Sequence, residues 1–207
     1  MFFYIALQFV ILMFAITIHE CAHGWVAYKR GDPTAKYMGR LTLNPLAHID
    51  PFGTIILPII LVILHIPPIG WAKPVPVNFL SLKNPRQDMF LVGAAGPAAN
   101  FVMAFFLSLI IKIAPGIANT LLGQVLVFGV IINMILGVFN LIPIPPLDGS
   151  RMLSAILPHK YLEAYNKIQP YGFIIIVALL YSGILRKLIY GVMLFVVKYL
   201  GINISLF

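Results

Sequence analysis

The amino-acid sequence predicts an all-α polytopic membrane protein: a bundle of about four to six transmembrane helices with a re-entrant loop or short hairpin near the functional site. Hydrophobic residues make up 61% and charged residues 10% of the 207 positions, whereas globular domains have roughly 45–50% and about 25%. The apolar residues form long runs, and most lysines and arginines lie between them. We expect one membrane-embedded domain over residues 1–207, with a core at 1–157 and a C-terminal apolar segment at 171–207.

The first apolar run, Met1 to Tyr28, is predicted to be one helix. At 1.5 Å per residue, about 28 residues reach roughly 42 Å, which exceeds the ~30 Å hydrocarbon core. The second half of this helix carries His19 to His23. Basic residues follow at once: Lys29, Arg30, Lys36 and Arg40. Because basic loops stay in the cytoplasm, this end of the helix is predicted to be cytoplasmic.

Two segments after the first helix are too short or too irregular to be clear spans. Met38 to Asp50 alternates apolar and polar residues around Asn44-Pro45, which predicts an extended hairpin or a loop. In Pro51 to Trp71 the uninterrupted apolar stretch covers only Ile55 to Leu64. A run this short favours a re-entrant segment, with a full span as the alternative.

Two further spans are predicted at Phe90 to Ile113 and Thr120 to Leu141. If the short segment before them dips and returns, these spans run outward and then inward, and they bring Asp148 to the same side as His23. Tyr171 to Phe207 is apolar apart from a basic pair near its middle. It is therefore either one tilted helix or two shorter ones.

The net charge of +8 is explained by membrane topology rather than by nucleic-acid binding. The basic residues form no concentrated tract, and a distribution of this kind attracts anionic membrane lipid. Cys21 is the only cysteine, so an intramolecular disulfide is impossible. We expect a multi-pass protein of the cell membrane that contacts lipid, does not bind nucleic acid, and has its functional site toward the cytoplasmic side.

His19, Glu20 and His23 form the pattern H-E-x-x-H inside the first apolar helix. Helix positions four apart are rotated by only about 40°, so both imidazoles face one side and can hold one metal ion. Glu20 lies about 60° from His23 on that side, within reach of a water molecule on the ion. Ionisable groups at membrane depth are costly and indicate a functional site. The alternative is a hydrogen-bonded cluster that joins helices.

A catalytic zinc site usually has three protein ligands and one open position. Asp148 follows a predicted span through the prolines of IPIPPLDG and can reach the site, but it can equally cap the helix that starts near Ser150. His48 and Asp50 are weaker candidates for the same position. The residues alone leave the third ligand open.

Three motifs resemble those of the site-2 proteases, a family of intramembrane zinc metalloproteases. They are HECAH in the first helix, GAAGPAAN in the span at 90–113, and NLIPIPPLDG after the span at 120–141. The resemblance implies one zinc ion per chain, with Glu20 as the general base and Asn140 in contact with the substrate backbone. The implied zinc ligands are His19, His23 and Asp148. The resemblance covers residues 1–157 and indicates a short form, without the peptide-binding or nucleotide-binding domain of larger members.

The activity that this resemblance implies is intramembrane proteolysis by a zinc metalloendopeptidase. Water activated by zinc would hydrolyse a peptide bond in or near a transmembrane helix of a substrate protein. Two alternatives use the same histidines. A metal-binding transporter would be expected to show repeats and polar residues spread over several spans. An inactive membrane scaffold would not need Glu20, which is present.

Overall fold

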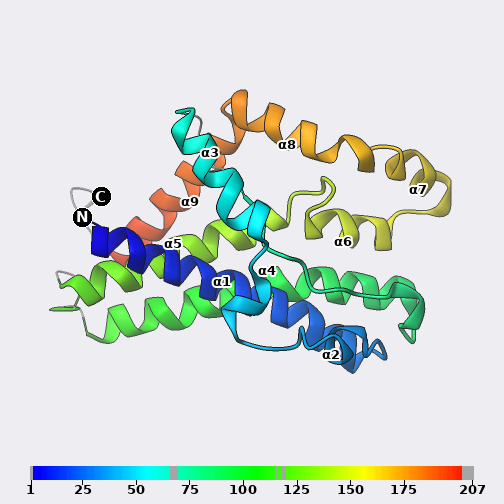
Figure 1. Cartoon of the computed structure of the whole chain (residues 1–207), viewed down its shortest axis with the longest axis horizontal. Coiled ribbons are helices and arrows are strands. Elements are labelled where there is room, and N and C mark those ends of the chain that lie inside the picture. The colour runs from blue at the N-terminus through cyan, green and yellow to red at the C-terminus, as the bar shows by residue number, and fades with distance from the viewer. Residues whose placement is uncertain (1, 66–69, 115, 118–119, 202–207) are drawn as a thin grey trace.

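The computed structural model describes residues 2–65, 70–114, 116–117 and 120–201, and these residues form helices and loops without any strand. Three helices are long and apolar enough to cross a membrane: α1 (Phe2–Lys29), α4 (Pro85–Ile113) and α5 (Leu121–Asn140). They lie side by side, and α4 packs against both of the others (Figure 1). A bent helix pair adds a fourth span if it is counted as one. The predicted all-α polytopic fold is confirmed. The described residues contain three such spans, one below the predicted four to six, or four if the bent pair is counted.

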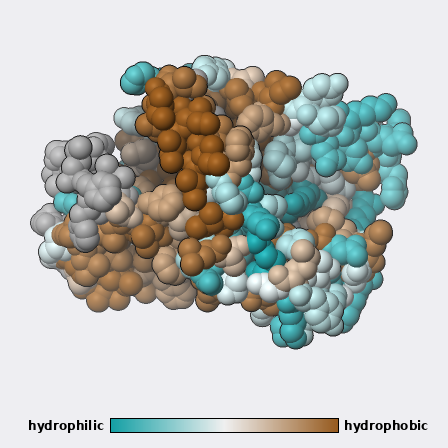
Figure 2. All heavy atoms as spheres, in the orientation of Figure 1, coloured by the Kyte–Doolittle hydropathy of each residue, from teal (hydrophilic) through white to brown (hydrophobic). Residues whose placement is uncertain are grey.

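The bundle is apolar at one end and polar at the other. Its apolar core joins α4 and α5 through Ala104, Ile111, Val127 and Val130. Figure 2 shows a hydrophobic surface over the end where α1 begins. The opposite end, with α2 (Thr34–Tyr37), α6 (Asp148–Ile156) and α7 (His159–Asn166), is largely hydrophilic. A bundle whose apolar end lies in lipid and whose polar end lies in water would show this division.

The segment between α1 and α4 enters and leaves the bundle on the same side. The amide of Lys83 donates to the carbonyl of Arg30 at 3.0 Å, which ties the start of α4 to the end of α1. Within the segment a π-helical stretch, η2 (Pro51–Ile56), continues into α3 (Leu57–Ile63). Together they reach about 20 Å, less than the ~30 Å needed to cross the hydrocarbon. A length this short favours the predicted re-entrant path over a full span, and residues 66–69 of the predicted range lie outside the described residues.

Residues 38–50 form a loop, and the alternative prediction of an extended hairpin is wrong. The only regular element there is a single 3-10 turn, η1 (Pro45–His48), within the described part of the chain. The guanidinium of Arg40 donates to the carbonyls of Ala47 and Lys73. These two backbone carbonyls therefore accept hydrogen bonds from a side chain and not from the amides of a neighbouring strand. The alternating pattern of apolar and polar residues forms no sheet here.

The C-terminal apolar segment is two helices, α8 (Gly172–Tyr181) and α9 (Ile184–Leu200). The helices on either side of the break are bent by 68°. The break falls at Gly183, whose φ of 78° is a left-handed conformation that ends a helix. The basic pair Arg186-Lys187 lies inside α9 and does not interrupt it. Residues 202–207 of the predicted segment lie outside the described residues.

Candidate metal centre

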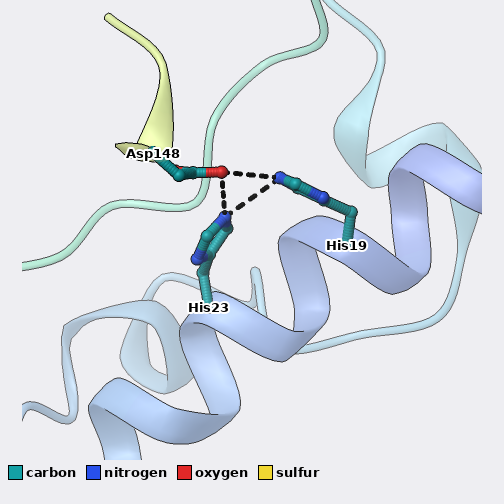
Figure 3. Close-up of side chains that lie close together, drawn as sticks. All are labelled: His19, His23 and Asp148. Atoms are coloured by element: carbon teal, nitrogen blue, oxygen red, sulfur yellow. Dashed lines mark hydrogen bonds and ion pairs between the residues drawn. The ribbon is translucent and has the colours of Figure 1, made fainter. Parts of the chain in front are cut away.

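Three buried side chains from two distant parts of the chain converge on one another inside the bundle (Figure 3). His19 and His23 lie one turn apart on α1, and Asp148 is the first residue of α6. Asp148 Oδ2 lies 3.0 Å from His19 Nε2 and 3.1 Å from His23 Nε2. The two Nε2 atoms are 3.1 Å apart. These three residues form a group that could hold a metal ion.

Helix α4 provides the close wall behind the two imidazoles. A Cβ atom at Gly96 would lie 2.4 Å from His23 Nε2 and 2.5 Å from His19 Nε2. Only glycine therefore leaves room for both rings at this point of the helix–helix contact. Gly149 allows a similarly close approach at the start of α6. A Cβ atom on this residue would lie 2.2 Å from the carbonyl oxygen of Leu141.

The outer nitrogen of each imidazole has its own hydrogen-bond acceptor. His23 Nδ1 donates to the carbonyl oxygen of Val92 at 2.6 Å, and His19 Nδ1 donates to Asn100 Oδ1 at 2.5 Å. Both acceptors belong to α4. Partners of this kind fix the tautomer and the ring orientation of metal-binding histidines.

Protons on both Nδ1 atoms leave two Nε2 lone pairs and one carboxylate oxygen facing each other. Three acceptors at 3.0–3.1 Å need a cation or a proton between them. Tetrahedral zinc with bonds of about 2.0–2.1 Å places its ligand atoms roughly 3.3 Å apart. Two neutral imidazoles and a carboxylate are also a donor set that zinc prefers. The residues present therefore fit a zinc ion.

The Asp148 carboxylate faces the histidines and does not cap α6. The N-cap of α6 is Leu147, and no side chain there accepts a helix amide. The second oxygen, Oδ1, lies 3.3 Å from Arg151 Nη1. Asp148 thus turns one oxygen to the imidazoles and the other to a guanidinium.

Glu20 lies next to this cluster but is not part of it. Its Oε2 accepts the amide of Val75 at 2.8 Å. Pro74 and Pro76 flank Val75 and have no N–H of their own, so Val75 carries the only backbone donor of this stretch. Val75 was not among the residues predicted from the sequence, although the Pro-Val-Pro spacing indicates an extended backbone with one available donor.

The other predicted candidates lie elsewhere. His48 Nε2 is 3.0 Å from the carbonyl oxygen of Thr42, and Asp50 Oδ1 accepts the amides at the start of η2. Neither belongs to the metal-binding group. Asn140 donates through Nδ2 to the carbonyl of Leu136 in its own helix at 3.0 Å. Its substrate contact stays a prediction.

Sequence comparison agrees with the donor set of this centre. The model of "Peptidase family M50" matches residues 7–116 and 110–182. The chain belongs to peptidase family M50. The resemblance to site-2 proteases is thereby confirmed, and this M50 chain is a zinc metalloprotease with membrane-spanning helices.

Curated relatives of this M50 chain have names of the same kind. "Putative zinc metalloprotease YwhC" of Bacillus subtilis is 41% identical over 177 residues, which cover 82% of this chain and 78% of that protein. "Putative zinc metalloprotease Rip2" of Mycolicibacterium smegmatis is 29% identical over 196 residues, or 92% and 73% of the two chains. "Zinc metalloprotease MJ0392" of Methanocaldococcus jannaschii is 27% identical over 157 residues, or 75% and 36%. No solved structure matches this M50 chain.

Proposed function

We propose that this chain is a single membrane-embedded domain that hydrolyses a peptide bond in or near a transmembrane helix of another protein. In this proposal His19, His23 and Asp148 bind one zinc ion, and Glu20 is the general base. The observation that carries the proposal is the convergence of three buried metal-ligand atoms within a bundle of membrane-spanning helices. A soluble protease does not need to place its metal between such helices.

The position of the histidines along α1 supports cleavage at membrane depth. His23 and His19 precede the end of α1 at Lys29 by distances of roughly 9 and 15 Å along the helix axis. Half of the hydrocarbon core is about 15 Å thick. Both imidazoles therefore lie below the membrane surface if Lys29 marks that surface, as its charge indicates.

The chemistry follows from the two kinds of side chain in the site. His19, His23 and Asp148 would hold the zinc ion, which would supply acidification of a water molecule and polarisation of a peptide carbonyl when bound. Glu20 takes the proton of the attacking water and delivers it to the leaving amine. The amide of Val75 holds the Glu20 carboxylate through Oε2, which leaves the other oxygen, Oε1, for this proton transfer.

The substrate helix has to unwind where it is cut. Carbonyl groups in an intact helix accept the amide four residues later and are shielded by the surrounding turns. A segment with weak helix propensity, such as one with glycine or proline near the cut, unwinds at a lower cost. The expected partner is therefore a transmembrane protein with such residues at the depth of His19.

Cleavage of a reconstituted substrate tests the proposed function. The zinc-loaded chain should cut a single-span protein in lipid vesicles, and mass spectrometry should place the new termini within or next to the span. A zinc chelator should stop the reaction, because it removes the metal. Cuts confined to distant soluble tails, or equal cutting of a soluble peptide, would contradict the proposal. A transporter that uses the same histidines would cut neither substrate.

We also propose that the site faces the cytoplasm across the cell membrane. Hydrogen bonds join the basic segments at one end of the bundle: Lys83 N–H to Arg30 O at 3.0 Å, and Arg86 Nε–H to Ala155 O at 2.6 Å. The other end of α4 carries Lys112. This asymmetry is the one that the positive-inside rule assigns to the cytoplasmic side.

Cysteine labelling tests this orientation. In a Cys21→Ala background, cysteines at Lys29, Lys83 and Arg151 should react only with reagent on the cytoplasmic side. A cysteine at Gly116 should react only from the opposite side. Labelling of position 83 from outside would contradict both the orientation and the re-entrant path of the segment before α4.

A further inference from the structure

Two buried asparagines extend from the candidate metal centre into the middle of the bundle. Asn100 of α4 has 0% of its surface exposed, and Asn133 of α5 has 2%. Asn100 Nδ2 donates to Asn133 Oδ1 at 2.8 Å, and Asn133 Nδ2 donates to the carbonyl of Gly129 at 2.8 Å. With His19 Nδ1 on Asn100 Oδ1, a relay of four polar groups crosses three spanning helices. Buried amides at membrane depth are costly unless they are paired, so the relay calls for a physical reason.

The direction of this relay is fixed by its far end. A backbone carbonyl can only accept a hydrogen bond, so Asn133 has to turn its NH₂ group toward Gly129 and its oxygen toward Asn100. Asn100 then has to present its NH₂ group to Asn133, which leaves its oxygen for His19. The same NH₂ group of Asn100 also lies 3.4 Å from the carbonyl oxygen of Ala15, a weaker second contact.

The near end of the relay is the imidazole of His19. An amide oxygen cannot donate, so Nδ1 of His19 has to carry the ring proton. The Nε2 lone pair then points at Asp148 Oδ2 and His23 Nε2, at 3.0 and 3.1 Å. His23 needs no such relay, because its Nδ1 meets the carbonyl of Val92 directly.

We propose that Asn133 is a positioning residue that sets the tautomer of His19 through Asn100, and thereby keeps Nε2 of His19 free to bind metal. This inference rests on the proposed role of His19 as a zinc ligand. A backbone carbonyl of α5 thus determines where the proton lies on a side chain of α1. Asn133 contacts neither metal nor substrate in this role.

Replacing Asn133 with leucine removes the acceptor that holds Asn100. The Asn100 amide can then turn over and present its NH₂ group to His19 Nδ1, which favours the tautomer with the proton on Nε2. That tautomer has no lone pair for a metal. Loss of a partner that orients a metal ligand typically lowers metal affinity about 10–100-fold, and we expect a decrease of this size for Asn133→Leu.

Zinc affinity and histidine tautomer are the two measurements. Competition with a chelator gives the affinity of the full-length chain in detergent. Nitrogen-15 spectra of the metal-free protein give the tautomer, recorded at a pH high enough that the imidazoles are neutral. Asn133→Leu should lower the affinity and move the His19 proton toward Nε2. The signals of His19 are assigned by their loss in His19→Ala.

Ser108→Ala is the matched control for loss of a buried polar group. Ser108 is 4% exposed on α4, and its hydroxyl donates to the carbonyl of Phe105 within the same helix. This variant should keep wild-type zinc affinity and an Nδ1-protonated His19. If Asn133→Leu does not fold, Asn133→Ala removes the same acceptor and should give the same two changes.

The possible outcomes separate this inference from the proposed function. Full zinc affinity in His19→Ala would overturn the metal site itself. Loss of zinc in His19→Ala, together with unchanged affinity and tautomer in the Asn133 variants, would overturn the relay alone. A loss of stability in Asn133→Leu with the His19 tautomer unchanged would show that Asn133 only joins α4 to α5, and would also overturn the relay.

Discussion

Glu20→Gln should lower the rate of peptide cleavage by about 10²–10⁴-fold while zinc content stays at the wild-type value. Glutamine has nearly the same shape and still accepts the amide of Val75 through its oxygen, so the fold should not change. It cannot take a proton from water, however, and the one carboxylate in the metal-binding group of the described residues is Asp148, which is proposed to be a zinc ligand. The measurement is cleavage of a transmembrane substrate at equal zinc occupancy.

His19→Ala is the comparison for this experiment. It should lose both zinc and activity, because a ligand is removed, whereas Glu20→Gln should lose activity alone. Equal rates for wild type and Glu20→Gln would rule out Glu20 as the base. An inactive scaffold would show no cleavage in the wild type either.

Val75 offers a second way to examine the same base without changing its carboxylate. Val75→Pro removes the N–H that lies 2.8 Å from Glu20 Oε2, and proline suits a segment that already contains Pro74 and Pro76. We expect a smaller loss of rate than for Glu20→Gln, with zinc retained. Val77→Pro is the matched control, since the Val77 amide donates to no group in the described part of the chain.

The sequence was sufficient to predict the spans because each is a long apolar run. Thr120 was predicted to start a span, and it is the N-cap of α5, where its side chain accepts the amide of Gly123. The helix α4 begins at Pro85, five residues before the predicted start at Phe90. A polar first turn outside the hydrocarbon gives no hydropathy signal, so this boundary could not be read from apolar residues.

The metal centre was predictable in part. The spacing of His19 and His23 in one helix requires their side chains to share a face. The approach of Asp148 depends on how α6 packs against α4, which residue patterns do not encode, and only the resemblance favoured it over a helix cap. Asn133 carries no local signal, because a single asparagine in a span has many possible partners. The hydrogen bonds to Asn100 and Gly129 that give it a direction exist only in the folded bundle.

Asp148→Asn should weaken zinc binding by more than the 10–100-fold that is typical when a partner of a metal ligand is lost. The amide keeps the size of the carboxylate but removes the negative charge that faces two imidazoles at 3.0 and 3.1 Å. A neutral amide is a poor zinc ligand, so only two of the three proposed ligands would remain. Zinc content and chelator competition measure the effect, and cleavage should fall in parallel.

Asp88→Asn is the matched control for this change. Asp88 is also a buried carboxylate, at 1% exposure, on the same side of the bundle. Its oxygens accept the amide of Asn84 at 2.8 Å and face Arg30 Nε at 3.6 Å, outside the metal-binding group. Asp88→Asn should keep full zinc content even if it lowers stability. Full zinc and activity in Asp148→Asn would mean that another group completes the site, because two imidazoles alone do not make the three-ligand set of a catalytic zinc.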